Sequence, residues 1–151
     1  MAVELGPKPL PRVFLSSDVG ANAVREARRA GLVAVRRGAF VEPLEDASRW
    51  DEEEHRAAAA VAAVGRRLRN GAVFTHESAA LLHGLWLLHS PEVVHVTQRS
   101  TPRRQSPGLR RHTGVVPQDV VTEVSGLRAT SVERTVVDCA KSMHPRDALV
   151  V

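Results

Sequence analysis

Six polar side chains near the N-terminus have the types and spacing that recognition of duplex DNA requires. They are Asn22, Arg25, Arg28, Arg29, Arg36 and Arg37. A helix is predicted over about residues 21–30, and it places Asn22, Arg25 and Arg29 on one face at i, i+3 and i+7. The last two arginines precede Gly38 between two short β-prone runs, which predicts a hairpin with both at its tip. Such a helix either reads base edges in the major groove while the hairpin contacts phosphates, or is a solvated face of an arginine-rich chain, and these residues alone favour neither.

A second basic set lies in the C-terminal half, where residues 93–118 contain no acidic residue. Its members are Arg99, Arg103, Arg104, Arg110 and Arg111. We predict a polar loop over residues 98–111, because the segment holds two prolines and few apolar residues. Such a loop is either a solvated segment or a secondary nucleic-acid contact that adds affinity by releasing counterions, and the sequence favours neither.

Three residues around position 80 have side chains that bind metals: His76, Glu77 and His83. The histidines are seven positions apart rather than the four of the H-E-x-x-H helix, and a third ligand such as His95 is only available by assumption. We therefore expect structural roles for them, with no metal and no cofactor.

Catalysis has little support in the sequence. Ser78, a histidine and Asp138 could be arranged as a triad, but no nucleophile elbow or glycine-rich phosphate loop accompanies them. Asp138 is better placed to pair with Arg134 at i, i+4, and Cys139 has the character of a small core residue. We predict that the chain is not an enzyme.

The bulk composition limits the class of protein. The 151 residues carry a formal net charge of +4, from 21 basic and 17 acidic residues, and nearly all the basic ones are arginines. That excess of positive charge does not indicate DNA binding by itself, so any such indication must come from where the arginines are placed in the sequence. One cysteine excludes an internal disulfide framework. No apolar run is long enough to span a membrane, so we expect a cytoplasmic protein with no membrane partner.

The segments between these side chains predict an α+β fold. We expect residues 1–13, which are rich in proline, to be extended, and we expect Ser48 with Asp51 to open a helix that ends at Gly71. Thr75 is expected to cap a second helix that stops at Gly84, and Trp86 then to enter the core. The run EVVHVT predicts a strand, because β-branched residues dominate it.

The C-terminal part predicts further strands and two helices. Strands are expected at Val115-Val116 and on both sides of a turn at Ser125-Gly126. Thr130 and Glu133 form a predicted capping box for a helix that runs to about Ser142. Pro145 then occupies the first position of a helix with few residues left, so we expect a second domain that is incomplete at its C-terminus.

Five segments of the chain together resemble one known family. They are, in order, ARRAGLVAVRRGAFV, THESAALLHGL, VVHVT, GLRATSVERTVVDCA and RDALVV. Their order and spacing, over roughly residues 14–151, resemble the AbiEi-type antitoxins of type IV, abortive-infection toxin–antitoxin systems in their actinobacterial form. The resemblance implies a winged helix-turn-helix followed by a small mixed α/β domain, in a DNA-binding transcriptional regulator that represses its own operon.

The resemblance also defines the expected organisation and partners. Residues 1–45 would form a shortened winged helix-turn-helix whose first helix is missing or vestigial, and residues 46–151 the antitoxin-like α+β domain. The partners would be double-stranded operator DNA and a nucleotidyltransferase-like toxin, which the antitoxin opposes in a way that does not require direct contact. Two alternatives stay open: a non-catalytic recognition module of a longer restriction-endonuclease-like protein, and a protein-interaction module with a degenerate winged helix.

Overall fold

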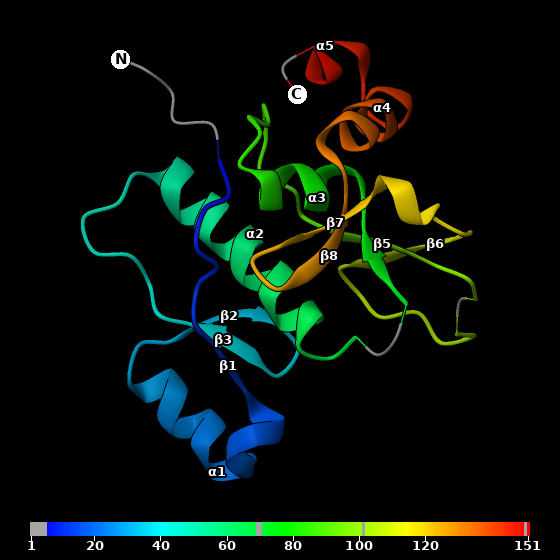
Figure 1. Ribbon diagram of the computed structural model, residues 1–151. Helices are drawn as coiled ribbons and strands as arrows, with labels where there is room; N and C mark the ends of the chain where they lie inside the picture. Colours follow the sequence, from blue (N-terminus) through cyan, green and yellow to red (C-terminus); the bar gives the residue numbers. More distant parts are fainter. Residues whose placement is uncertain (1–5, 69–70, 101, 150) are drawn as a thin grey trace. The chain divides into compact units, whose positions relative to one another are not determined.

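The chain forms a mixed α+β structure, as the sequence predicts, and its strands form two sheets (Figure 1). This computed structural model describes residues 6–68, 71–100, 102–149 and 151. The described chain divides into two compact units, one spanning Leu10–Arg67 and the other the remainder. No helix within the described ranges is long and apolar enough to cross a membrane.

The first unit is built on a small antiparallel sheet in the order β1-β3-β2. Its strands are β1 (Val13–Leu15), β2 (Val33–Arg36) and β3 (Ala39–Val41). β2 and β3 form the predicted hairpin, with Arg37 and Gly38 in the turn. The central strand β3 is buried along its whole length, so it joins the other two strands into one layer.

The helix between β1 and β2 is interrupted. α1 (Ser16–Arg29) contains Gly20 at φ 77° and ψ 169°, which separates a first turn at 16–19 from a helix at 21–29. Only glycine adopts that conformation without strain, so the break is encoded at one position. The predicted helix over 21–30 is thereby confirmed, and one helical turn precedes the break at Gly20.

The helix α2 (Arg49–Gly65) belongs to the first unit, and it ends before the predicted end at Gly71. Ser48 caps it with the predicted capping box to Asp51. Ala59 and Ala63 on α2 pack in one core cluster with strand residues such as Val41, because small side chains let the helix approach the sheet closely. The first unit therefore extends to Arg67, whereas the sequence analysis sets the boundary at residue 45.

The second unit contains a five-stranded mixed sheet in the order β6-β5-β4-β8-β7. The strands are β4 (Val73–Phe74), β5 (Val94–Gln98), β6 (Leu109–Thr113), β7 (Val121–Val124) and β8 (Leu127–Thr130), with a short 3-10 turn η1 (Gln118–Val120) before β7. β4 pairs antiparallel with β5 and parallel with β8, and β5 pairs parallel with β6. The predicted hairpin of β7 and β8 is confirmed, and both of its turn residues, Ser125 and Gly126, have positive φ.

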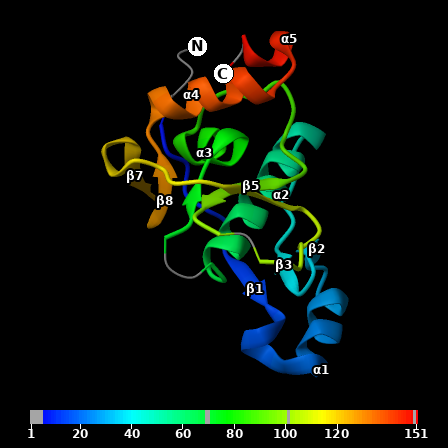
Figure 2. The same cartoon turned by 90° about the vertical axis from the view of Figure 1, so that its right-hand side faces the viewer.

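Helices of the second unit are stacked outward from the sheet. α3 (His76–His83) lies between β5 and α4 (Val132–Ser142), as Figure 2 shows, and α5 (Pro145–Ala148) follows α4. α3 ends at Gly84 in the left-handed conformation, as predicted. Pro145 occupies the first turn of α5, also as predicted.

Several predicted details in the second unit are wrong. Thr75 stands at the N-cap position of α3 without a capping bond, because its hydroxyl is engaged by Thr97 and by the His76 ring. The cap of α4 is Ser131 rather than Thr130, one residue later than expected.

Two hydrophobic sites are also misassigned. Trp86 is 60% exposed instead of buried, since it follows the end of α3 while its neighbour Leu87 enters the core. Val115 lies outside any strand and is 68% exposed.

Candidate functional sites

The first unit presents the basic residues singled out in the sequence on its surface. Asn22 and the three arginines of α1 are exposed, as is Arg37 in the hairpin turn, while Arg36 is partly buried. The only acidic residue on the 21–29 helix, Glu26, is exposed as well. The structure thus brings four of the six residues onto one exposed helix and the other two onto the adjoining hairpin.

The hairpin turn is fixed to the rest of the unit by its carbonyl groups. The Ser16 N–H donates to the Gly38 carbonyl at 2.9 Å. Arg67 donates to the same carbonyl at 3.0 Å and to that of Arg37 at 3.1 Å. Gly38 has φ 69°, a left-handed conformation that favours glycine at this turn. The turn is therefore held by its backbone, and the Arg37 side chain is exposed.

Arg66, which follows α2, forms hydrogen bonds to α1 and to β1. Arg66 donates to the Asp18 carboxylate at 2.6 Å and to the Val13 carbonyl at 2.9 Å. Because Arg66 and Arg67 follow α2 directly, that helix anchors both the first turn of α1 and the hairpin turn.

The second basic set is divided between a loop and a strand. Arg99, Arg103 and Arg104 are exposed in the connection between β5 and β6. Arg110 and Arg111 lie on β6, which corrects the prediction that the loop continues to residue 111. The sequence obscures this strand because a charged edge strand lacks the usual β-branched residues.

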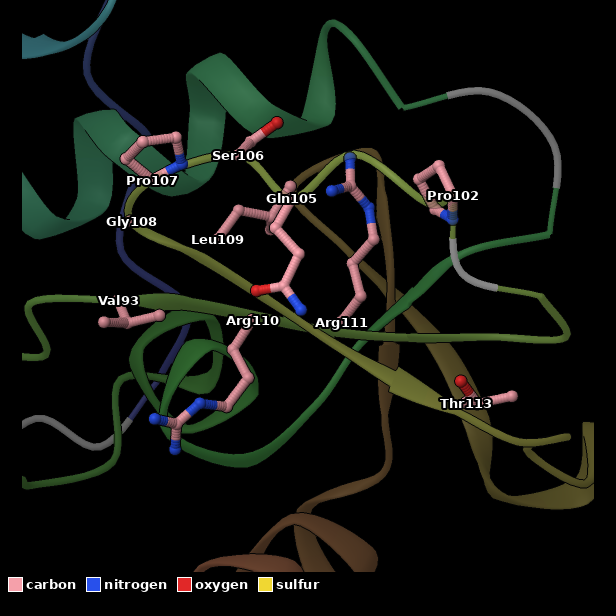
Figure 3. A pocket seen from close by; sticks show the side chains of 10 residues that line it. All are labelled: Val93, Pro102, Gln105, Ser106, Pro107, Gly108, Leu109, Arg110, Arg111 and Thr113. Atoms are coloured by element: carbon pink, nitrogen blue, oxygen red, sulfur yellow. The ribbon is translucent and has the colours of Figure 1, made fainter.

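The two strand arginines leave β6 in opposite directions (Figure 3). Both line a pocket of about 580 Å³ formed with the preceding loop, including Gln105 and Ser106. Arg110 also acts electrostatically on a group of histidines described next, so the five arginines do not form one uniform patch.

Three histidines from three elements meet in the second unit. His76 is the first residue of α3, His95 lies on β5 and His112 on β6. One ligating atom from each can be chosen so that all lie within 4.8 Å of one another. The rings of His76 and His112 are stacked with centroids 4.2 Å apart, and His95 is 5% exposed.

Polar partners hold the cluster in place. The His95 Nδ1 and the His112 Nε2 are hydrogen-bonded at 3.1 Å, and the His95 Nε2 lies 3.3 Å from a Glu77 carboxylate oxygen. The His76 Nδ1 is bonded to the Thr75 hydroxyl at 2.9 Å. Each histidine thus has at least one ring nitrogen in a specific contact.

The surroundings favour uncharged imidazoles. Burial lowers the pKa of His95 to about 4, with further lowering by His76, His112 and Arg110. Burial also lowers the pKa of His76 and of His112, against an opposing effect of Asp138. Burial raises the pKa of Glu77.

The other residues considered as metal ligands or catalytic groups each have a separate structural contact or are buried in the core. His83 lies outside the cluster, and its Nε2 is bonded to the Thr130 carbonyl at 2.7 Å. The Ser78 hydroxyl accepts from the His95 backbone N–H at 2.8 Å, so it is engaged structurally. Asp138 pairs with Arg134 at 2.9 Å and Cys139 is fully buried, both as predicted.

Sequence reasoning misses His112 entirely. Only the parallel pairing of β5 with β6, which aligns His112 with Thr97, brings it beside His95. The sequence contains one indication of this contact, because His95 and His112 lie in strands that follow one another along the chain. The polar composition of β6 hides it.

In comparisons with protein-family models, with curated proteins and with solved structures, nothing matches this chain.

Proposed function

We propose that the first unit is a shortened winged helix-turn-helix that binds duplex DNA. On this proposal the chain represses its own operon and is the antitoxin of a type IV toxin–antitoxin system. The observation that best supports this proposal is the order of the elements. A strand is followed by two helical segments that are separated at Gly20, and then by a hairpin whose second strand pairs with both β1 and β2. A helix-turn-helix has two helices joined by a short turn that often contains glycine, and a wing is a hairpin that follows the second helix.

The exposed side chains support a recognition role for the 21–29 helix. Asn22, Arg25 and Arg29 share its face and stand in solvent. Asparagine can bond adenine and arginine can bond guanine in the major groove, while the hairpin arginines are suited to phosphates.

The helix α2 supplies the support that a first helix gives in longer members of this class. It packs on the sheet and, through Arg66 and Arg67, holds both the first turn of α1 and the hairpin turn. A recognition helix braced in this way keeps its orientation to the groove, so the missing first helix need not abolish binding.

The regulatory part of the proposal rests on the resemblance described above. An AbiEi-type antitoxin opposes a nucleotidyltransferase-like toxin and represses the operon that encodes both. Binding to the chain's own upstream DNA is the physical event that such repression requires.

The direct test measures binding of the full chain to its upstream DNA by fluorescence anisotropy, beside a duplex of scrambled sequence. We expect tighter binding to the upstream DNA, with a ratio of at least about 10³ for a specific site. Arg49→Ala serves as a charge-matched control, because Arg49 is exposed on α2 and contacts only Glu53 in the described bonds. If neither duplex binds at low salt, the proposal fails and the protein-interaction reading is favoured.

A further inference from the structure

The histidine cluster of the second unit meets the first geometric requirement of a metal site. Its ligating nitrogens come from a helix, an interior strand and an edge strand, and they converge to within 4.8 Å. In a tetrahedral zinc site with Zn–N bonds of 2.0–2.1 Å, two nitrogens are about 3.4 Å apart. The His95 Nδ1 and His112 Nε2 are already 3.1 Å apart, so a small separation of these two rings would admit an ion between them.

Two of the histidines have outer partners that orient them. Metal-bound histidines commonly donate their second ring N–H to a carboxylate or another oxygen. Glu77 lies at the His95 Nε2, which leaves the Nδ1 facing His112. The Thr75 hydroxyl lies at the His76 Nδ1, and Thr97 in turn bonds Thr75 at 3.1 Å, which leaves the His76 Nε2 for an ion.

The backbone of His76 is held in an unusual conformation. Its φ is 54°, in the left-handed region that costs a non-glycine residue of order 1–3 kcal/mol. Strain of this kind persists where the surroundings over-determine it and is frequent at functional sites. Here it occurs at the residue that turns from β4 into α3 and directs its ring onto His112.

The charges around the cluster oppose one another. Glu77 and the nearly buried Asp138 favour a cation, and Arg110 disfavours it. Burial lowers the pKa of each of the three histidines, which favours neutral imidazole, the form that binds metals.

We propose that His76, His95 and His112 form a three-histidine site for a divalent transition-metal ion, zinc foremost. Three nitrogen ligands suit zinc and leave one coordination position for water or another small ligand. The site belongs to the second unit, so this inference goes beyond the DNA binding proposed for the first.

The test is a titration of the full chain, freed of metal with a chelator, with Zn²⁺ alone by calorimetry. We expect one ion per chain with a dissociation constant of about 1 μM or tighter, and a rise in melting temperature with zinc concentration. Co²⁺ as a second probe should give the visible absorption of a four-coordinate nitrogen-ligated ion. No saturable binding by the folded wild-type chain would overturn the proposal, whatever the variants do.

Variants assign the site. His112→Gln should weaken zinc binding at least 100-fold, and Glu77→Gln should weaken it 10- to 100-fold, because Glu77 orients His95 without binding the ion. His89→Gln is the matched control, since His89 is exposed on the connection after α3. Circular dichroism establishes that each variant is folded. Equal affinity for zinc in folded His112→Gln and in wild type would show that the ion binds elsewhere and would overturn the proposal.

Discussion

Arg25 and Arg29 share an exposed helix face with Asn22, whereas several other arginines of the first unit bond to protein groups. Arg66 and Arg67 bond carbonyls and a carboxylate, and Arg49 pairs with Glu53. We therefore expect Arg25→Ala or Arg29→Ala to cost roughly 1–3 kcal/mol of binding to the upstream DNA and less on scrambled duplex, if either reads a base. Anisotropy titrations with both duplexes measure the difference.

The matched change Arg49→Ala should leave both affinities within about 0.5 kcal/mol of wild type, because an exposed i, i+4 ion pair contributes little. Equal losses on both duplexes would assign the α1 arginines to phosphate contacts. If Arg25→Ala and Arg29→Ala had no effect while loss of Arg103 and Arg104 weakened binding, the second unit would be the site of DNA contact.

Cys139 illustrates how burial decides the chemistry of a single group. It is fully buried, and burial, followed by Glu77 and Asp138, raises the pKa of its thiol to about 12. Since the thiolate is the nucleophile, we expect reaction with an aromatic disulfide reagent at pH 8 to be at least ~100-fold slower in the native chain than in denaturant. Absorbance of the released thiolate measures both rates. Native labelling as fast as in denaturant would show that α4 opens readily from α3.

At the scale of elements, Gly20 determines that α1 is two helical segments rather than one. An alanine at φ 77° and ψ 169° is strained, so Gly20→Ala should lower the free energy of unfolding by roughly 1–3 kcal/mol or straighten the helix. Urea unfolding and operator binding together measure this, and we expect both to weaken. Gly6→Ala is the control, because Gly6 has open space around a new Cβ and no positive φ. A Gly20→Ala chain with unchanged stability and operator affinity would remove the turn from the proposed recognition unit.

The elements that could be predicted are those with local signals. Ser48 and Asp51 predict the start of α2 through a capping box, and Gly38 and Gly126 predict the turns of two hairpins. These features depend on residues within a few positions of one another, so the sequence displays them directly.

Elements defined by long-range pairing could not be predicted in the same way. β6 becomes a strand because β5 pairs with it, although its sequence Leu109–Thr113 is mostly polar. The helix α2 joins the first unit because its alanines fit the sheet, which no local pattern indicates. The histidine cluster depends on the same pairing. The sequence suggested His76 with His83, which the structure keeps apart, named His95 as an available third ligand, and omitted His112.

At the scale of the whole molecule, the net charge of +4 is modest, and its distribution matters more than its size. The 21–29 helix and the following hairpin hold five arginines and one acidic residue, whereas the first turns of α2 are rich in acidic residues. An uneven distribution of this kind lets a nearly neutral chain bind a polyanion through one face.

That distribution predicts a steep dependence of DNA binding on salt. If about six phosphates are contacted, affinity should fall by roughly 10³ between 50 and 200 mM salt, because each contact releases condensed counterions. Replacing Arg36 and Arg37 together by glutamate should weaken binding to upstream and scrambled duplex by a similar factor. The same change should flatten the plot of log affinity against log salt by about two units, since phosphate contacts carry no base information. Anisotropy titrations over a salt series measure both slopes, with thermal unfolding to establish that the hairpin variant is folded. Loss of discrimination between the two duplexes with an unchanged slope would mean that the hairpin reads bases and the helix does not.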